Sequence, residues 1–202
     1  MRRVPVGVLA SGTGSNLGAL LSAAATAEFP AEIVVVGSDR PMAPALDRAR
    51  AAGVPTFAHR ARDFSDRPSF DAAMAAGLKQ HGAEWVVLAG YMRLVSSAFL
   101  GAFPDRVVNV HPALLPSFPG THAQRQAFDA GVKVSGVTVH LVDEGMDTGP
   151  ILAQAAVPVL DDDDADRLAA RILKAEHQLL PVTLARAVTE PWRRDGRRIL
   201  WG

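Results

Sequence analysis

Short apolar runs rich in β-branched residues alternate with helical segments along the first half of the chain. The runs are residues 4–10, 33–37, 54–58 and 85–90, and the helical segments are residues 17–29, 45–53 and 68–81. A short continuous apolar run is typical of a strand that is buried on both faces of a parallel sheet. The alternation therefore predicts an α/β fold with a mostly parallel, twisted, Rossmann-like sheet and right-handed crossovers.

The second half of the chain departs from this rhythm. Three strands are predicted at residues 107–110, 134–142 and 151–159, and only one short helix, residues 122–130, lies among them. Parallel strands need long crossover connections, so some of these strands should pair antiparallel. The predicted fold is a mostly parallel α/β sheet with antiparallel strands in its C-terminal half.

Four consecutive aspartates at residues 161–164 precede a long amphipathic segment. Acidic residues are favourable at a helix N-terminus, so we interpret the run as a helix start. A divalent cation site is the weaker interpretation, because the run lacks spaced ligands. Pro181 is expected to kink or interrupt the helix, since its ring opposes the carbonyl of His177. Residues 196–202 are predicted to form a last short strand.

Length and composition limit the possible functions. A chain of 202 residues suits one domain, residues 1–202, with halves of about 1–100 and 101–202. Lys plus Arg equals Asp plus Glu at 21 each, which gives no overall field for nucleic acid or an anionic membrane. The chain has no cysteine, which excludes disulfides and a thiol nucleophile and fits a cytoplasmic protein. No apolar stretch is long enough to span a membrane.

A glycine loop follows the first predicted strand. The sequence from Gly12 to Asn16 is GTGSN, and it lies directly before the first helix. Backbone amides and a helix N-terminus favour a phosphate there, although a simple tight turn would also use these residues. A dinucleotide site remains open, because Asp39 ends the second strand as such sites require. Against it, Leu17 stands where the third glycine belongs, with Gly18 one place late.

Polar side chains stand at the ends of two predicted core strands. Asn109 and His111 end one strand, and an acidic loop that ends at Asp147 follows the next one. An amide can donate to an oxyanion, an imidazole can move a proton, and a carboxylate can orient the imidazole. Such a group suits acyl transfer, although Asn or His at a strand end is often only structural. The same two interpretations hold for His140, which lies within the second strand.

The segment LAGYMRLVS, residues 88–96, follows the strong strand at residues 85–90. From the pattern alone, Tyr91, Met92 and Leu94 would be ordinary core residues after a strand. A ligand-lining role is the alternative.

Two stretches of this chain strongly resemble the core signature of the folate-dependent formyltransferases. They are NVHPALLPSFPG from Asn109 and GVTVHLVDEGMDTGPIL from Gly136. The whole chain is similar to the members that formylate 5-phosphoribosylglycinamide, and ASGTGSNLGALL from Ala10 resembles their phosphate loop. The resemblance implies 10-formyltetrahydrofolate as co-substrate, a place in purine (IMP) biosynthesis, and a monomer or homodimer without metal, nucleic acid or membrane.

The resemblance also implies roles for individual residues. Its catalytic residues are Asn109, His111 and Asp147. Those implied to contact the phosphoribosylglycinamide are Thr13, Gly14, Ser15, Asn16, Gly90 and Glu176. Those implied to line the folate site are Met92, Arg93, Leu94, Val142, Asp143, Glu144, Gly145 and Met146, and those implied to support the site are Thr138, His140 and His122. The chain departs from some members at Leu173 and Gln124, which affects the expected substrate contacts.

The expected reaction is a direct attack of the glycinamide amine on the formyl carbon. Asn109 and His111 would stabilise the tetrahedral oxyanion, and Asp147 would keep His111 charged and order a water that moves the proton. Three other functions fit parts of the pattern: a 10-formyltetrahydrofolate hydrolase, a nicotinamide-dependent dehydrogenase that uses the glycine loop, and a folate-binding protein without activity. The last requires that the three side chains do not meet in space.

Overall fold

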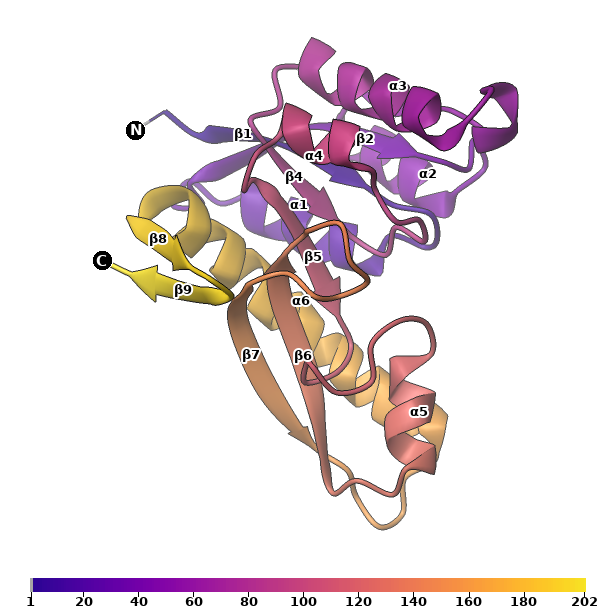
Figure 1. Cartoon of the computed structure of the whole chain (residues 1–202), viewed down its shortest axis with the longest axis vertical. Coiled ribbons are helices and arrows are strands. Elements are labelled where there is room, and N and C mark those ends of the chain that lie inside the picture. The colour runs from indigo at the N-terminus through magenta and orange to yellow at the C-terminus, as the bar shows by residue number, and fades with distance from the viewer. Residues whose placement is uncertain (1) are drawn as a thin grey trace. The chain divides into compact units, whose positions relative to one another are not determined.

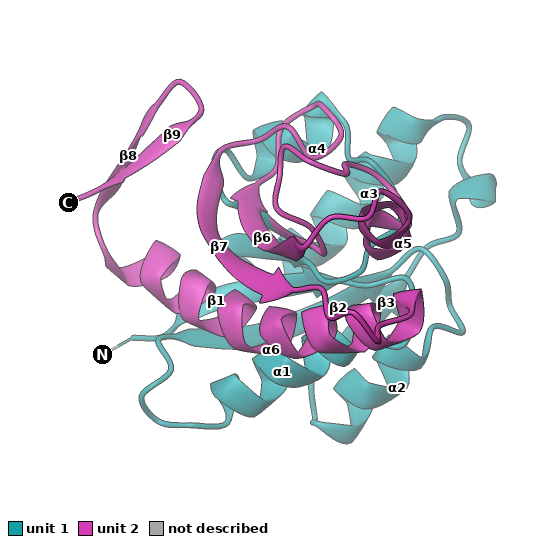
Figure 2. Ribbon diagram, turned by 90° about the horizontal axis from the view of Figure 1, so that it is seen from below, with its two compact units in different colours: residues 1–108 teal, residues 109–202 magenta. Residues whose placement is uncertain are grey.

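The computed structural model describes residues 2–202, and the chain divides into two compact units. Unit 1 comprises residues 1–108 and unit 2 comprises residues 109–202 (Figure 2). The boundary falls inside the strand β5, Val107–His111.

Unit 1 contains parallel strands with helices on both faces. The strands are β1 (Val4–Leu9), β2 (Ala31–Ser38), β3 (Thr56–Ala58) and β4 (Trp85–Leu88), in the order β3-β2-β1-β4 with the start of β5 next. The helices are α1 (Ser15–Ala24), α2 (Pro44–Ala51), α3 (Arg67–Gln80) and α4 (Ser97–Ala102), with a 3-10 turn at Ala61–Asp63. Helices α1 and α2 cover one face of these strands and α3 and α4 the other (Figure 2).

The core of unit 1 explains why its strands are apolar throughout. Val8 is fully buried and pairs with Val36 of β2 and Val87 of β4, which are also fully buried. A strand with helices on both faces has no solvent side, so an alternating pattern is absent. The four strands predicted in this half are confirmed, and each boundary agrees to within two residues.

Unit 2 contains the antiparallel part of the fold. Its strands are β6 (Val134–Leu141), β7 (Ile151–Pro158), β8 (Trp192–Asp195) and β9 (Arg198–Trp201), and the order after β5 is β6-β7-β9-β8. Strands β6 and β7 are antiparallel, as are β8 and β9, whereas β7 and β9 are parallel. The helices are α5 (Ala123–Asp129) and α6 (Ala165–Thr189), and α6 lies along β6 and β7 (Figure 1). The predicted α/β class with antiparallel C-terminal strands is confirmed.

Helix α6 corrects one expectation. Pro181 was expected to kink or interrupt it; the helix runs through Pro181 to Thr189, so an interruption is excluded. Leu180 and Leu184 are fully buried on this helix, and α6 as a whole packs against β6 and β7, which favours continued helix through Pro181. The acidic run starts the helix as predicted: Asp164 is the N-cap and accepts from the backbone N–H of Arg167 at 2.8 Å.

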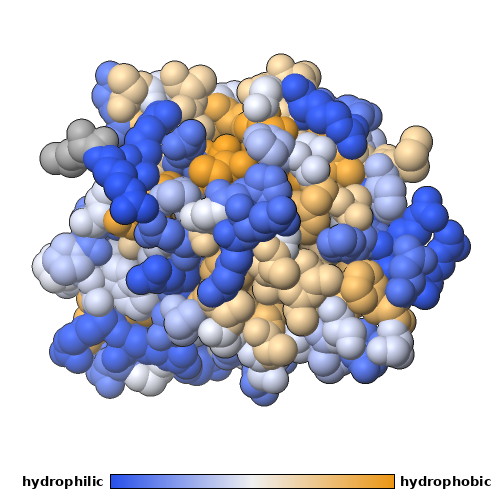
Figure 3. All heavy atoms as spheres, turned by 90° about the horizontal axis from the view of Figure 1, so that it is seen from above, coloured by the Kyte–Doolittle hydropathy of each residue, from blue (hydrophilic) through white to orange (hydrophobic). Residues whose placement is uncertain are grey.

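The surface is polar over most of the face that Figure 3 shows, and apolar side chains gather in a small area at its upper centre. Within residues 2–202, no helix combines the length and the apolar character that crossing a membrane requires.

Candidate active site

Strand β5 carries two polar residues on an apolar strand. Val107, Val108 and Val110 are buried and fix its place in the core. The side chain of Asn109 is half-buried, and His111, at the end of the strand, is only 4% exposed. The strand thus presents an amide and an imidazole from a rigid element.

Asp147 approaches both side chains from the loop after β6. Its Oδ2 lies 3.3 Å from Nδ1 of His111, and its Oδ1 is 3.5 Å from Nδ2 of Asn109. The backbone N–H of Gly120 donates to Oδ2 at 2.8 Å and fixes the carboxylate. Asp147 has a left-handed backbone, φ 56°, which aspartate tolerates better than most residues. The three residues implied to be catalytic therefore meet in unit 2.

His140 fixes the orientation of the Asn109 amide. Its Nδ1 lies 2.8 Å from the carbonyl of Leu141, and a carbonyl only accepts, so this nitrogen carries a hydrogen. Nε2 then accepts from Nδ2 of Asn109 at 3.2 Å. Both N–H groups of the amide consequently point toward His140 and Asp147. His140 is 1% exposed and lies on the next strand, as its expected supporting role requires.

The charge of His111 is set by two opposing effects. Burial lowers the pKa of His111, while Asp147 and the carbonyl of Phe118, which accepts from Nε2 at 2.8 Å, raise it. Burial outweighs them, so the pKa of His111 lies below its usual value of 6.5. Burial thus opposes the effect expected of Asp147, and the charged state of His111 stays a prediction.

The carboxylate of Asp147 remains ionised. Burial would raise the pKa of Asp147, but the hydrogen bond from the Gly120 N–H and the neighbouring His111 hold it below its usual value of 3.8. A fixed negative charge thus lies beside an imidazole that can accept a proton.

Thr138 holds the chain that follows His111. Its hydroxyl donates to the carbonyl of Ala113 at 2.7 Å and accepts from the N–H of Leu115 at 3.0 Å. The side chain of Gln154 donates to the same hydroxyl at 3.0 Å and to the carbonyl of Leu115 at 2.9 Å. Thr138 is fully buried, and its one donor and two acceptor positions are all used.

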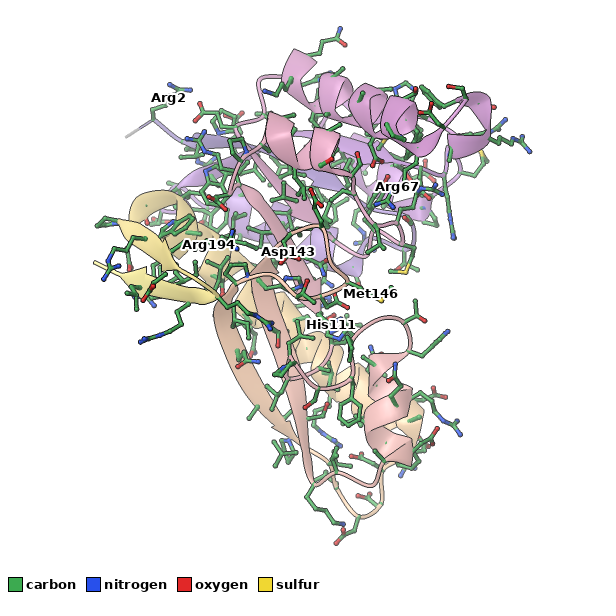
Figure 4. All side chains as sticks on the ribbon, in the orientation of Figure 1. Arg2, Arg67, His111, Asp143, Met146 and Arg194 are labelled. Carbon is green, nitrogen blue, oxygen red and sulfur yellow. The ribbon has the colours of Figure 1, made fainter. Side chains whose placement is uncertain are left out.

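The loop between β6 and β7 is braced by its own side chains. Asp143 accepts from the N–H of Gly145 at 3.1 Å and from the hydroxyl of Thr148 at 2.7 Å. Figure 4 shows Asp143 and Met146 with His111 in this part of unit 2. A Cβ at Gly120 would lie 3.0 Å from the sulfur of Met146, whose side chain is half exposed. Val142 is half-buried and Glu144 is exposed, so the loop offers both apolar and acidic side chains.

The glycine loop of unit 1 has the features of an anion site. Gly14 is the N-cap of α1 with φ 72°, and neither a side-chain cap nor an acidic residue is found in the first turn. A Cβ at Gly14 would lie 2.8 Å from the Cβ of Ala45, so close approach to α2 also requires glycine. Thr13 is exposed, Ser15 is half-buried and Asn16 is 8% exposed. The uncapped N–H groups of the first turn favour a negative charge.

The segment after β4 is not ordinary core. Tyr91 is 7% exposed, but Met92 is 62% and Leu94 is 45% exposed, so the core interpretation holds only for Tyr91. The guanidinium of Arg93 lies 5.1 Å from the centre of the Phe70 ring. Gly90 has φ 71°, a conformation that favours glycine. Exposed apolar side chains beside a fixed cation can receive a flat ligand with a charged end.

The remaining implied residues lie in unit 2. Glu176 is buried on α6, at 5% exposure, and Leu173 is half-buried on the same helix. His122 is exposed and is the left-handed N-cap of α5, and Gln124 follows in the first turn. The side chain of His122 makes no capping hydrogen bond to α5.

Two residues of the site were missed from the sequence. Phe118 and Gly120 bind His111 and Asp147 through a backbone carbonyl and a backbone N–H. Side-chain motifs carry no signal for backbone groups, and only the proline-rich loop around them indicated a fixed chain path. Among the described residues, no three His, Asp or Glu side chains are grouped as a metal site would require.

Comparison with known proteins identifies the family. The family model described as formyl transferase matches residues 4–184. A phosphoribosylglycinamide formyltransferase of Mycobacterium tuberculosis is 48% identical over 195 residues, which is 96% of this chain and 90% of that protein. The trifunctional purine biosynthetic protein adenosine-3 of Drosophila melanogaster is 48% identical over 93% of this chain, but the chain spans only 14% of that protein.

A solved structure agrees with these matches. The crystal structure of glycinamide ribonucleotide transformylase 1 from Symbiobacterium toebii matches this chain with a TM-score of 0.94 and 46% sequence identity. The match covers 98% of this chain and 94% of the Symbiobacterium chain. The sequence matches, the shared fold and the contact between Asn109 and Asp147 all indicate the same family. The chain belongs to the formyl transferase family, among its phosphoribosylglycinamide formyltransferases.

Proposed function

We propose that the protein transfers the formyl group of 10-formyltetrahydrofolate to the amine of 5-phosphoribosylglycinamide in purine biosynthesis. The observation that carries this proposal is that the Asp147 carboxylate lies 3.3 Å from His111 and 3.5 Å from Asn109 in unit 2. The choice of substrates follows from the family to which the chain belongs. The glycine loop of unit 1, whose helix N-terminus has no side-chain cap, is a suitable place for the ribotide phosphate.

The amine attacks the formyl carbon, and a carbon–nitrogen bond forms while the carbonyl oxygen becomes an oxyanion. Asn109 has two N–H groups, of which one is engaged by His140 at 3.2 Å. The other makes only a long contact of 3.5 Å with Asp147, so an oxyanion can take it at little cost. The fixed amide therefore provides one directed donor for the intermediate.

His111 supplies the second stabilising group. Burial lowers the pKa of His111, and the charge of Asp147, 3.3 Å from its Nδ1, opposes that effect. The appearance of an oxyanion beside it adds a second negative charge next to that of Asp147, and this raises the pKa of His111. A protonated His111 places its positive charge beside the developing oxyanion, which stabilises the transition state more than the bound substrate.

The proton balance requires no net exchange with solvent. The attacking nitrogen loses a proton, the bond from the formyl carbon to N10 of the folate breaks, and N10 gains a proton. Asp147 orders a water that carries this proton between the two nitrogens. No covalent intermediate on the enzyme is needed.

The folate contacts are proposed separately for each unit, as the family implies. In unit 1 they are the exposed Met92 and Leu94 with Arg93 between them, and in unit 2 they are the loop of residues 142–146 with its exposed Met146. Gly90, Thr13, Ser15, Asn16 and Glu176 are proposed for the ribotide. Thr138 fixes the chain at Ala113 and Leu115. His122, the N-cap residue of α5, is proposed as a further supporting residue because the family implies it.

A spectrophotometric assay with 10-formyltetrahydrofolate tests the proposal. Folate product that forms only when 5-phosphoribosylglycinamide is added would support the transfer. Equal product without the acceptor would show a hydrolase instead. No product in either case would reject both reactions.

A further inference from the structure

Asp39 is the residue that a dinucleotide site would use and that formyl transfer leaves without a role. It follows β2, where its carboxylate could bind a ribose. In the structure this carboxylate is already engaged: the hydroxyl of Ser11 donates to Oδ1 of Asp39 at 2.6 Å. Ser11 is 2% exposed and follows β1, so the pair joins the ends of two neighbouring strands.

The same hydroxyl also holds the chain after β4. The backbone N–H of Met92 donates to Oγ of Ser11 at 2.9 Å, and the N–H of Ser11 donates to the carbonyl of Gly90 at 3.1 Å. A hydroxyl has one hydrogen and two lone pairs. Because Asp39 takes the hydrogen, the lone pairs of Ser11 must face Met92, and the charge of Asp39 strengthens Ser11 as an acceptor.

The segment that Ser11 holds has few other supports. Residues 89–96 lie between β4 and α4 and form neither helix nor strand. Ala89 N–H donates to the carbonyl of Leu9 at 2.9 Å at one end, and Ser96 N–H donates to Asp71 at 2.7 Å at the other. The contact to Met92 lies between these ends, directly before Arg93.

We propose that Ser11 and Asp39 are positioning residues for the folate segment, residues 92–94. Asp39 orients the Ser11 hydroxyl, and Ser11 fixes the Met92 amide and thereby the exposed side chains beside it. The inference rests on the proposed function, since it assigns the segment to folate. It gives Asp39 a role in formyl transfer that does not involve a ribose.

Two substitutions and their combination test this chain of contacts. Ser11→Ala leaves the Met92 N–H without its partner, so KM for 10-formyltetrahydrofolate should rise roughly tenfold while kcat stays within about twofold. Asp39→Ala should raise the same KM about threefold. The KM of the double variant should be no higher than that of Ser11→Ala, because Asp39 acts only through Ser11.

A matched control and a rescue separate positioning from general damage. Ser135 of β6 is also 2% exposed, but its hydroxyl has no hydrogen-bond partner. Ser135→Ala should therefore leave this KM unchanged. Asp39→Asn keeps an oxygen that accepts from Ser11 and should restore KM to within about twofold of wild type.

Calorimetric titration with tetrahydrofolate, without acceptor, separates this inference from the proposed function. Weaker tetrahydrofolate binding by Ser11→Ala supports the inference even if the wild type shows no turnover, a result that would reject the proposed reaction alone. Equal tetrahydrofolate binding by wild type and Ser11→Ala would overturn the inference. Additive effects of the two substitutions would also overturn it, because Asp39 would then act independently of Ser11.

Discussion

The charge of Asp147 offers a quantitative test of the proposed reaction. Asp147→Asn removes the negative charge that lies 3.3 Å from Nδ1 of His111 but keeps the shape of the side chain. The new amide oxygen can still accept from Gly120, and asparagine tolerates the left-handed backbone at φ 56°. The variant should therefore fold normally.

The expected loss follows from Coulomb's law. Two unit charges separated by 3.3 Å interact by about 5 kcal/mol at an effective dielectric constant of about 20. The side chain of Asp147 is 12% exposed, so solvent reduces this attraction. A remainder of about 3–4 kcal/mol in the transition state corresponds to a decrease in kcat of roughly 10²–10³-fold.

The assay is the dependence of kcat on pH. Asp147 raises the pKa of His111, so its neutralisation lowers that pKa further below the usual value. The charged imidazole is the active form in the intermediate, and activity is lost as pH rises through its pKa. The high-pH limb of the variant should therefore lie at lower pH than that of wild type.

Removal of a carboxylate charge elsewhere in unit 2 provides the control. Asp129 of α5 is exposed and pairs with Arg125, and Asp129→Asn removes the same charge from unit 2. It should leave kcat and the pH profile unchanged. If Asp147→Asn retained kcat within about threefold with an unmoved limb, the charge would have no part in catalysis.

Three further predictions concern stability and the glycine loop. Thr138→Val removes three hydrogen bonds from a buried hydroxyl and should lower the free energy of unfolding by about 1–3 kcal/mol in urea titrations. The pKa of Asp163 is lowered to about 2 by Arg171, so Asp163→Asn should lower Tm at neutral pH, and the difference should vanish as pH falls from about 4 toward 2. Gly14→Ala meets Ala45 as well as an unfavourable φ, whereas Gly53→Ala has the same φ in open space. Only Gly14→Ala should therefore raise KM for the ribotide, and it should lower Tm more in thermal scans.

The sequence predicted the strands and the meeting of the polar residues for the same reason. Apolar runs such as the one before Asn109 mark core strands, and neighbouring strands bring their ends together. Helix α4 and strand β8 were missed, because α4 has only 6 residues and β8 is largely exposed. Neither shows enough periodicity to be recognised.

The finer chemistry depends on distances that no motif contains. Burial of His111 outweighs the charge of Asp147, and their balance follows from packing around the loop. The orientation of the Asn109 amide follows from the hydrogen on His140, which is set by the carbonyl of Leu141. Such effects require three-dimensional coordinates.

The left-handed backbone of Phe118 has a consequence for directed evolution. A bulky residue at φ 55° costs roughly 1–2 kcal/mol relative to an ordinary conformation, whereas glycine carries no such cost. The hydrogen bond between His111 and Phe118 uses the backbone carbonyl of Phe118, which any residue supplies. A library selected for heat resistance should therefore enrich glycine at this position and retain turnover, so that thermal tolerance and catalytic rate can be improved independently within a few ångströms of the catalytic imidazole.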